Sequence, residues 1–146
     1  MLPKKETLEI EFKSDVKRYP DKDIIEAVSA MANTNGGILY LGVEDNGIVT
    51  GLHKSHMDAI GLVALIANNT IPSVSVRAEI VIENQHNVMK ISIPMSRAVV
   101  STSSGKILKR RLKNLAIINL MILLILLKKV ILLLLLTLLK ILRLVS

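Results

Sequence analysis

Cysteine and tryptophan are absent from the sequence, and among its 146 residues there are only one phenylalanine and two tyrosines. Without cysteine the chain forms no disulfide bonds and no zinc sites built on thiolates. With so few aromatic residues it offers no aromatic platform on which the bases of single-stranded nucleic acids would stack. The N-terminus holds no apolar run of signal-peptide length, so we expect a cytoplasmic protein.

Acidic residues, glycine, proline and aromatic residues are all missing after residue 114, where the sequence becomes mostly leucine and isoleucine. We therefore predict a domain at 1–114, which has an ordinary globular composition, and a separate apolar tail at 115–146. The longest charge-free stretch of this tail, 115–127, is shorter than the ~20 residues needed to span a bilayer. Three interpretations stay open: a product of out-of-frame translation or truncation, a membrane segment, or a helix that mediates oligomerisation. A membrane partner is expected only if the tail is a native segment.

The positive charge of the chain is local rather than general. All twelve acidic residues lie in 1–105 together with ten basic ones, so the formal charge of that stretch is −2. The next eight positions then carry five basic residues, namely Lys106, Lys109, Arg110, Arg111 and Lys113. Such a cluster predicts contacts with nucleic-acid phosphates, which release counterions and need no reading of the bases. A solvated charged strand would have the same pattern, and this alternative stays open.

Hydrophobic periodicity predicts an α+β fold. Alternating or continuous apolar residues indicate strands, and an apolar stripe at helical spacing indicates helices. Strands are predicted at 8–12, 38–43, 48–52, 74–83 and 89–93. Helices are predicted at 21–32 and 55–67, and a last short strand around 98–102. The order β-α-β-β-α-β-β indicates a mixed β-sheet with two helices packed on one face.

Capping residues predict where the two helices begin and end. Asp21 is the expected N-cap of the first helix, and Ser55-x-x-Asp58 has the spacing of a capping box for the second. The pair Gly36-Gly37 follows a helix and enters a strand, which favours a C-cap and close strand packing over a phosphate-binding loop.

One tight turn and the positions of the histidines can also be predicted. The segment 45–47, Asp-Asn-Gly, predicts a two-residue hairpin turn in which both central positions have positive φ. The three histidines share no ligand spacing, and we expect them at the surface; they are His53, His56 and His86.

Two blocks of sequence resemble a known family. Residues 6–13 are similar to an E-x(4)-E-F-K opening, and residues 32–47 are similar to the core A-N-T-x-G-G-x-L-x-x-G-V-x-D-x-G. Residues 101–111, STSSGKILKRR, are similar to a basic C-terminal element of bacterial members. The chain thus resembles the Alba-like (AlbA_2) DNA-binding domain of the Schlafen superfamily, of the bacterial transcriptional-regulator type. The resemblance implies an Alba/Schlafen-like fold, a homodimer, and a nucleic-acid partner that is DNA rather than RNA.

The same resemblance implies an enzyme as an alternative. In the ribonuclease branch of the Schlafens, two glutamates five apart and a later aspartate form a cluster, and Glu6, Glu11 and Asp45 match those positions. Such carboxylates could hold Mg²⁺ or Mn²⁺, which activates water for RNA cleavage. In the alternative without catalysis, Glu11 lies on a solvated strand face and Asp45 forms a turn. Animal Schlafen cores pair two units around a zinc site, whereas this chain has one unit and no cysteine.

We therefore expect a nucleic-acid-binding transcriptional regulator rather than an enzyme, with no cofactor outside the nuclease alternative. A protein-interaction module is a further alternative. Nucleotide hydrolysis is excluded, because the single Gly-Lys pair, Gly105-Lys106, lacks both the following Ser/Thr and the first glycine of a P-loop.

Overall fold

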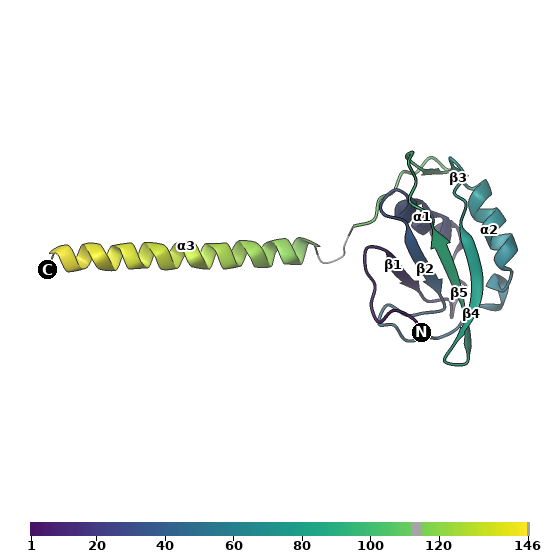
Figure 1. The fold of residues 1–146 in the computed structure, drawn as a ribbon, viewed down its shortest axis with the longest axis horizontal. Helices are drawn as coiled ribbons and strands as arrows, with labels where there is room; N and C mark the ends of the chain where they lie inside the picture. Colours follow the sequence, from purple (N-terminus) through teal and green to yellow (C-terminus); the bar gives the residue numbers. More distant parts are fainter. Residues whose placement is uncertain (112–114, 146) are drawn as a thin grey trace. The chain divides into compact units, whose positions relative to one another are not determined.

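The computed structural model describes residues 1–111 and 115–145. The chain divides into two compact units between Arg110 and Arg111. The first unit contains, in order, β1 (Ile10–Lys13), α1 (Asp21–Ala32), β2 (Gly37–Leu41), the 3-10 turn η1 (Lys54–His56), α2 (Ala59–Asn68), β3 (Thr70–Ile71), β4 (Arg77–Glu83), β5 (His86–Ile93) and β6 (Ser101–Thr102) (Figure 1). The second unit contains the helix α3 (Leu115–Val145). The boundary at residue 114 stays a prediction.

A four-stranded mixed sheet forms the centre of the first unit. Its strand order is β1-β2-β5-β4; β1 and β2 run parallel, and the other two pairings are antiparallel. A second, two-stranded sheet joins β3 to β6. The predicted α+β class with a mixed sheet is therefore confirmed, and the sheet of β3 and β6 is a feature that the sequence pattern did not predict.

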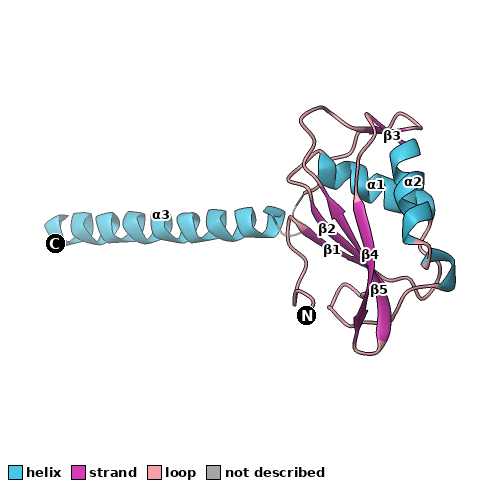
Figure 2. Cartoon of the chain, turned by 45° about the vertical axis from the view of Figure 1, so that its right-hand side comes forward, coloured by secondary structure: helices cyan, strands magenta, loops and turns pink. Residues whose placement is uncertain are grey.

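Both helices pack on one face of the four-stranded sheet (Figure 2). The alternation of β2 explains how two cores form, because successive side chains of a strand point to opposite faces. Leu39 and Leu41 belong to the larger core with residues of α1, α2 and β5. Tyr40 points the other way into a smaller cluster, where its ring centroid lies 5.9 Å from that of Phe12.

The junction between α1 and β2 depends on two glycines. Gly36 has φ +69° and donates from its backbone N–H to the carbonyl of Met31 at 2.8 Å, which closes the end of α1. Gly37 has φ +128°, and a Cβ there would collide with the backbone carbonyl of Glu9, directly before β1. The predicted close strand packing is confirmed, whereas the C-cap of α1 is Asn33 and not the glycine pair.

The predicted helix starts are wrong in detail. Asp21 is the first residue of α1, whose N-cap is Pro20 without any side-chain cap. Ser55 lies in η1, and α2 begins only after Asp58, whose carboxylate accepts a hydrogen bond from the N–H of Gly61 at 2.9 Å. The spacing of the capping box predicts the N-cap at Ser55, which is one turn too early, because the 3-10 turn η1 precedes the helix and Asp58 is the N-cap.

The segment 48–52 does not form the predicted strand. Gly47 does turn the chain at φ +85°, and it is the only residue of 45–47 with a positive φ. After the turn, one isolated bridge between Val43 and Val49 and backbone hydrogen bonds such as that from the N–H of Thr50 to the carbonyl of Gly42 at 2.9 Å remain of the predicted pairing. The N–H of Leu52 then donates to the carbonyl of Asn87 at 2.8 Å, so the segment leaves its expected partner for the neighbouring strand. The predicted strand at 74–83 likewise begins only at Arg77.

Candidate nucleic-acid interface

The basic run that follows β6 is an extended segment on the surface of the first unit. Its described residues do not form a strand, and one isolated β-bridge joins Ser101 to Ile107. Its side chains alternate: Leu108 and Arg110 are partly buried, whereas Lys109 and Arg111 are exposed. This alternation follows from extended backbone, in which neighbouring side chains point to opposite sides.

The end of α1 holds this segment in place. The side-chain amide of Asn33 donates to the carbonyl of Leu108 at 2.9 Å and to that of Val100 at 2.7 Å. The hydroxyl of Thr34 accepts a hydrogen bond from the N–H of Arg110 at 3.0 Å. Asn33 and Thr34 belong to the A-N-T block of the sequence, so two of its polar side chains fix the backbone of the basic run. Sequence reasoning did not give them this role.

Two of the five predicted phosphate contacts are engaged within the domain. Arg110 forms an ion pair with Glu11 and donates to the carbonyl of Ile10 at 2.9 Å, and only 13% of its side chain is exposed. Lys106 lies 2.7 Å from Glu26 and, by this hydrogen bond, holds the pKa of that carboxyl below its ordinary value. We interpret both as anchors of the segment, because a phosphate contact would have to break an existing ion pair.

The other predicted phosphate contacts are Lys109, Arg111 and Lys113. Lys109 and Arg111 are exposed, and no ion pair or side-chain hydrogen bond joins them to another described residue. Lys113 lies outside the described residues. The arrangement therefore presents Lys109 to solvent from a backbone that the domain holds in place, and Arg111 directly after it, which suits contact with a phosphate chain.

The three predicted carboxylates have separate surroundings. An oxygen of Glu6 accepts a hydrogen bond from the N–H of Phe12 at 3.0 Å, and Glu11 is paired with both Lys13 and Arg110. Asp45 lines a different depression, described below. Across residues 1–111 and 115–145, no three His, Asp or Glu side chains are grouped so that they could hold a metal ion. The residues present do not make a ready site for Mg²⁺ or Mn²⁺, and the nuclease role stays a prediction.

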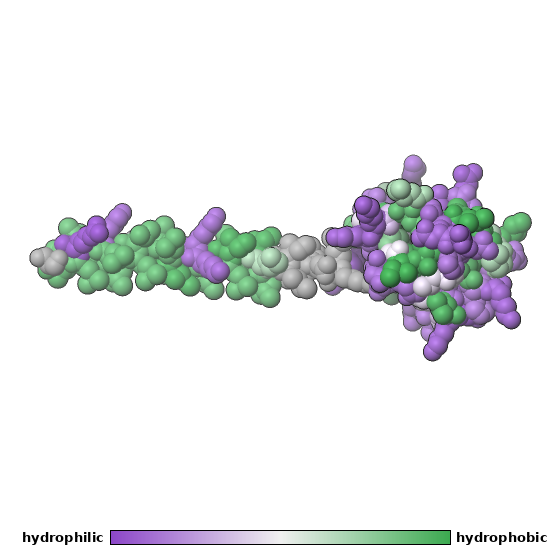
Figure 3. Space-filling view, turned by 90° about the horizontal axis from the view of Figure 1, so that it is seen from below, coloured by the Kyte–Doolittle hydropathy of each residue, from purple (hydrophilic) through white to green (hydrophobic). Residues whose placement is uncertain are grey.

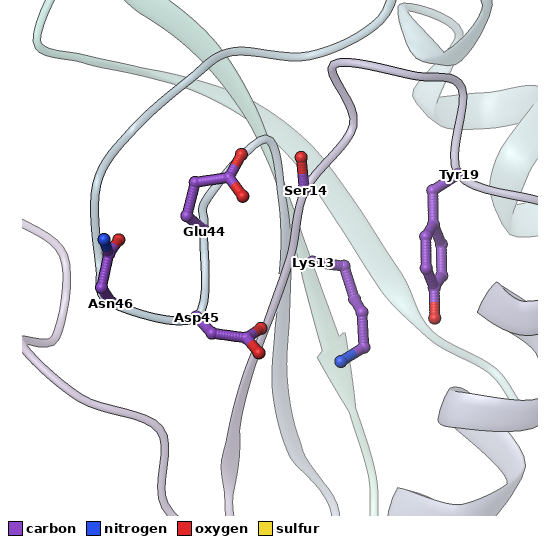
Figure 4. A pocket seen from close by; sticks show the side chains of 6 residues that line it. All are labelled: Lys13, Ser14, Tyr19, Glu44, Asp45 and Asn46. Carbon is purple, nitrogen blue, oxygen red and sulfur yellow. The ribbon is translucent and has the colours of Figure 1, made fainter.

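A polar depression lies where the parallel strands β1 and β2 end. It is lined by Lys13, Ser14, Tyr19, Glu44, Asp45 and Asn46 (Figure 4). Partial burial, followed by the negative charges of Asp23, Glu11 and other carboxylates, raises the pKa of Tyr19 to about 12. The Tyr19 hydroxyl is therefore neutral at physiological pH, so it can donate a hydrogen bond but carries no charge for binding.

A buried histidine–aspartate pair beside this depression was missed. Asp15 is fully buried, and both of its oxygens lie within 3.0 Å of Nδ1 of His56. The backbone N–H groups of Tyr19 and His53 donate to the same carboxylate at 2.7 and 2.8 Å. The prediction that His56 lies at the surface is wrong, since only 4% of it is exposed. No sequence signal marked the pair, because its members lie far apart in the chain.

Comparison with known proteins concerns mainly this first unit. A family model described as Schlafen, AlbA_2 matches residues 6–118. A crystal structure of the DIP2311 protein from Corynebacterium diphtheriae is similar, with a TM-score of 0.60, 20% identity, and coverage of 71% of this chain and 21% of that one. The chain thus spans about a fifth of that protein.

A second similar structure is that of an N-terminal domain from Nitrosomonas europaea, from a protein described as related to the ATP-dependent DNA helicase RecG. It has a TM-score of 0.53 and 20% identity, and the match covers 74% of this chain and 81% of that one. At this level of identity both likenesses concern the fold.

Proposed function

The chain belongs to the Schlafen AlbA_2 family, and from this premise we propose that it binds DNA through phosphate contacts of Lys109, near the end of the first unit, and of Arg111, the first residue after it. Family membership supports an association with nucleic acids. The RecG-related neighbour, which is named after a DNA helicase, favours DNA over RNA. The observation that carries the proposal is the exposure of both cations, together with the hydrogen bonds by which Asn33 and Thr34 hold the backbone of Leu108 and Arg110 on either side of Lys109.

The charge distribution explains why the position of these cations matters. Residues 1–105 have a formal charge of −2, so the body of the domain does not attract a polyanion. Salt bridges tie Lys106 to Glu26 and Arg110 to Glu11, which keeps those two carboxylates neutralised beside the segment. Lys109 and Arg111 then face solvent next to neutralised carboxylates, and they can contact phosphates without reading bases. Binding is expected to be weak, in the micromolar range, and tolerant of sequence.

A homodimer would strengthen this interaction. Two copies of the domain on one duplex would double the number of exposed cations that contact phosphates. Each additional contact releases counterions and increases both the affinity and its dependence on salt. We propose that the protein acts as such a dimer in the cytoplasm and regulates transcription by occupying DNA.

The test is fluorescence anisotropy of a labelled duplex with the full chain in a non-ionic detergent at low salt. The double variant Lys109→Ala/Arg111→Ala is expected to bind at least tenfold more weakly than the parent. The matched control is Lys54→Ala/Arg77→Ala, which removes the same charge from exposed positions, one of them on the opposite edge strand β4. The proposal fails if both double variants lose affinity equally or if the parent does not bind at low salt.

The ribonuclease alternative is tested in the same samples. Labelled RNA is incubated with Mg²⁺ or Mn²⁺, and cleavage that Glu11→Ala abolishes would favour the nuclease over a purely binding role.

A further inference from the structure

The second unit contains one long helix with a largely apolar surface. From Leu120 to Val145 the helix has a mean hydropathy of 2.8, and none of this span is buried. Every side chain along it is exposed (Figure 3). An apolar surface of this extent is more than a soluble monomer tolerates, and it marks an interaction with another protein or with a membrane.

The charged residues of α3 are not spread evenly around the helix. With 3.6 residues per turn, each residue advances by about 100° around the axis. If Lys128 is placed at 0°, Arg143 falls at about 60°, Lys129 at about 100° and Lys140 at about 120°. The hydroxyl of Thr137 falls at about 180° and is satisfied within the helix by the carbonyl of Leu134 at 2.7 Å. Between Leu120 and Val145, the half of the circumference opposite the cations carries Thr137 and otherwise only apolar residues.

This distribution has the chemistry of an anionic lipid surface. Four cations and no acidic residue lie in 115–146, so the charged half of the helix complements negatively charged head groups. The other half offers leucine and isoleucine side chains to the boundary of the acyl chains. A helix whose basic residues gather on one side can bind in this way, with its axis in the plane of the interface and the apolar side chains between the cations at the head-group boundary.

A spanning orientation fits the same helix less well. The hydrocarbon core of a bilayer corresponds to about 20 helical residues. Every window of that length within Leu120–Val145 contains both Lys128 and Lys129, and an ammonium group within the core is costly. When the helix lies along the surface, all four cations reach the head groups and the apolar half stays in contact with lipid.

From these observations we infer that α3 lies along the surface of a bilayer containing anionic lipids. Its charged half, with Lys128, Lys129, Lys140 and Arg143, faces the head groups, and its leucine- and isoleucine-rich half lies in the acyl boundary. This inference concerns the second unit and does not depend on the DNA-binding proposal.

Vesicle flotation tests the partner. The full chain is transferred from detergent to vesicles of phosphatidylcholine alone or of phosphatidylcholine with phosphatidylglycerol. We expect stronger binding to the anionic vesicles, and a loss of about 25-fold on them for Lys128→Gln/Lys129→Gln, since each cation near such a surface contributes about fivefold. The matched control Lys17→Gln/Lys54→Gln changes the same charge at exposed positions of the first unit and is expected to bind as the parent does. Equal binding to both kinds of vesicle would overturn the inference, as would self-associated protein that does not float.

The orientation of α3 in the bilayer is tested with spin labels on single introduced cysteines. The chain has no native cysteine, so each label has one attachment site. Labels at Leu123, Leu134 and Leu138 on the apolar half are expected at one common depth, and labels at Leu132 and Leu136 on the charged half at a shallower one. A depth that is greatest in the middle of the helix and falls toward both ends, whichever half carries the label, would show a spanning helix and overturn the inference.

Discussion

Replacing Asp15 with alanine should destabilise the first unit more than any surface carboxylate does. The fully buried carboxylate accepts hydrogen bonds from the N–H groups of Tyr19 and His53 and from the ring of His56. Alanine leaves all three donors without their acceptor. Breaking a buried pair by removing one partner costs about 3–5 kcal/mol, which is a large part of the ~5–15 kcal/mol that stabilises a typical domain.

The measurement is urea unfolding of the full chain in a non-ionic detergent, followed by tyrosine fluorescence. Both tyrosines, Tyr19 and Tyr40, lie in the first unit and there is no tryptophan, so the signal does not report on α3. The matched control is Asp58→Ala, which removes one exposed N-cap hydrogen bond and should cost only ~1 kcal/mol. If Asp15→Ala lowers the free energy of unfolding no more than Asp58→Ala does, the buried pair does not have the stabilising role assigned to it here.

Three further predictions concern the same unit. Gly37→Ala should lower the free energy of unfolding by several kcal/mol more than Gly105→Ala in the same experiment. Both glycines have positive φ, but the new Cβ would collide with the backbone of Glu9 at position 37 and would meet open space at position 105. The ultraviolet titration of the native chain should show that Tyr19 ionises near pH 12 rather than near 10. Because the pKa is higher in the folded state than in the unfolded state, the free energy of unfolding should fall as the pH rises from about 10 to about 12. Ionisation near pH 10 in the native chain would contradict the burial of the ring. Removal of 115–146 should leave a folded, soluble dimer in size-exclusion chromatography with light scattering, while the full chain needs detergent; a truncated chain that unfolds would show that the tail belongs to the core.

The parts of the fold that could be predicted from the sequence are those that depend on local patterns. Alternating apolar residues predict β1, β4 and β5, and a continuous apolar run predicts β2, because the pattern of each strand is contained in the strand itself. The two-residue strand β3 is too short to show any period, and its pairing with β6 is formed across a long separation in sequence. The segment 48–52 has the composition of a strand, but it keeps only an isolated bridge to its predicted partner, and Leu52 at its end bonds to Asn87 in β5 instead.

The candidate site shows the same limit. Counting charges identifies the basic run, but it does not separate Lys109 and Arg111 from Lys106 and Arg110. That distinction depends on Glu26 and Glu11, which reach the run only through the fold. The buried Asp15–His56 pair was missed for the same reason.

The salt dependence of DNA binding tests the central claim most directly. For duplex DNA, the slope of the logarithm of the binding constant against the logarithm of the salt concentration falls by about 0.9 for each phosphate contact. If Lys109 and Arg111 each contact one phosphate, Lys109→Ala/Arg111→Ala should reduce the steepness of this slope by about 1.8 for one copy of the domain, and Lys54→Ala/Arg77→Ala should leave it unchanged. A parent slope that neither double variant changes would contradict the account, since the phosphate contacts would then be made elsewhere.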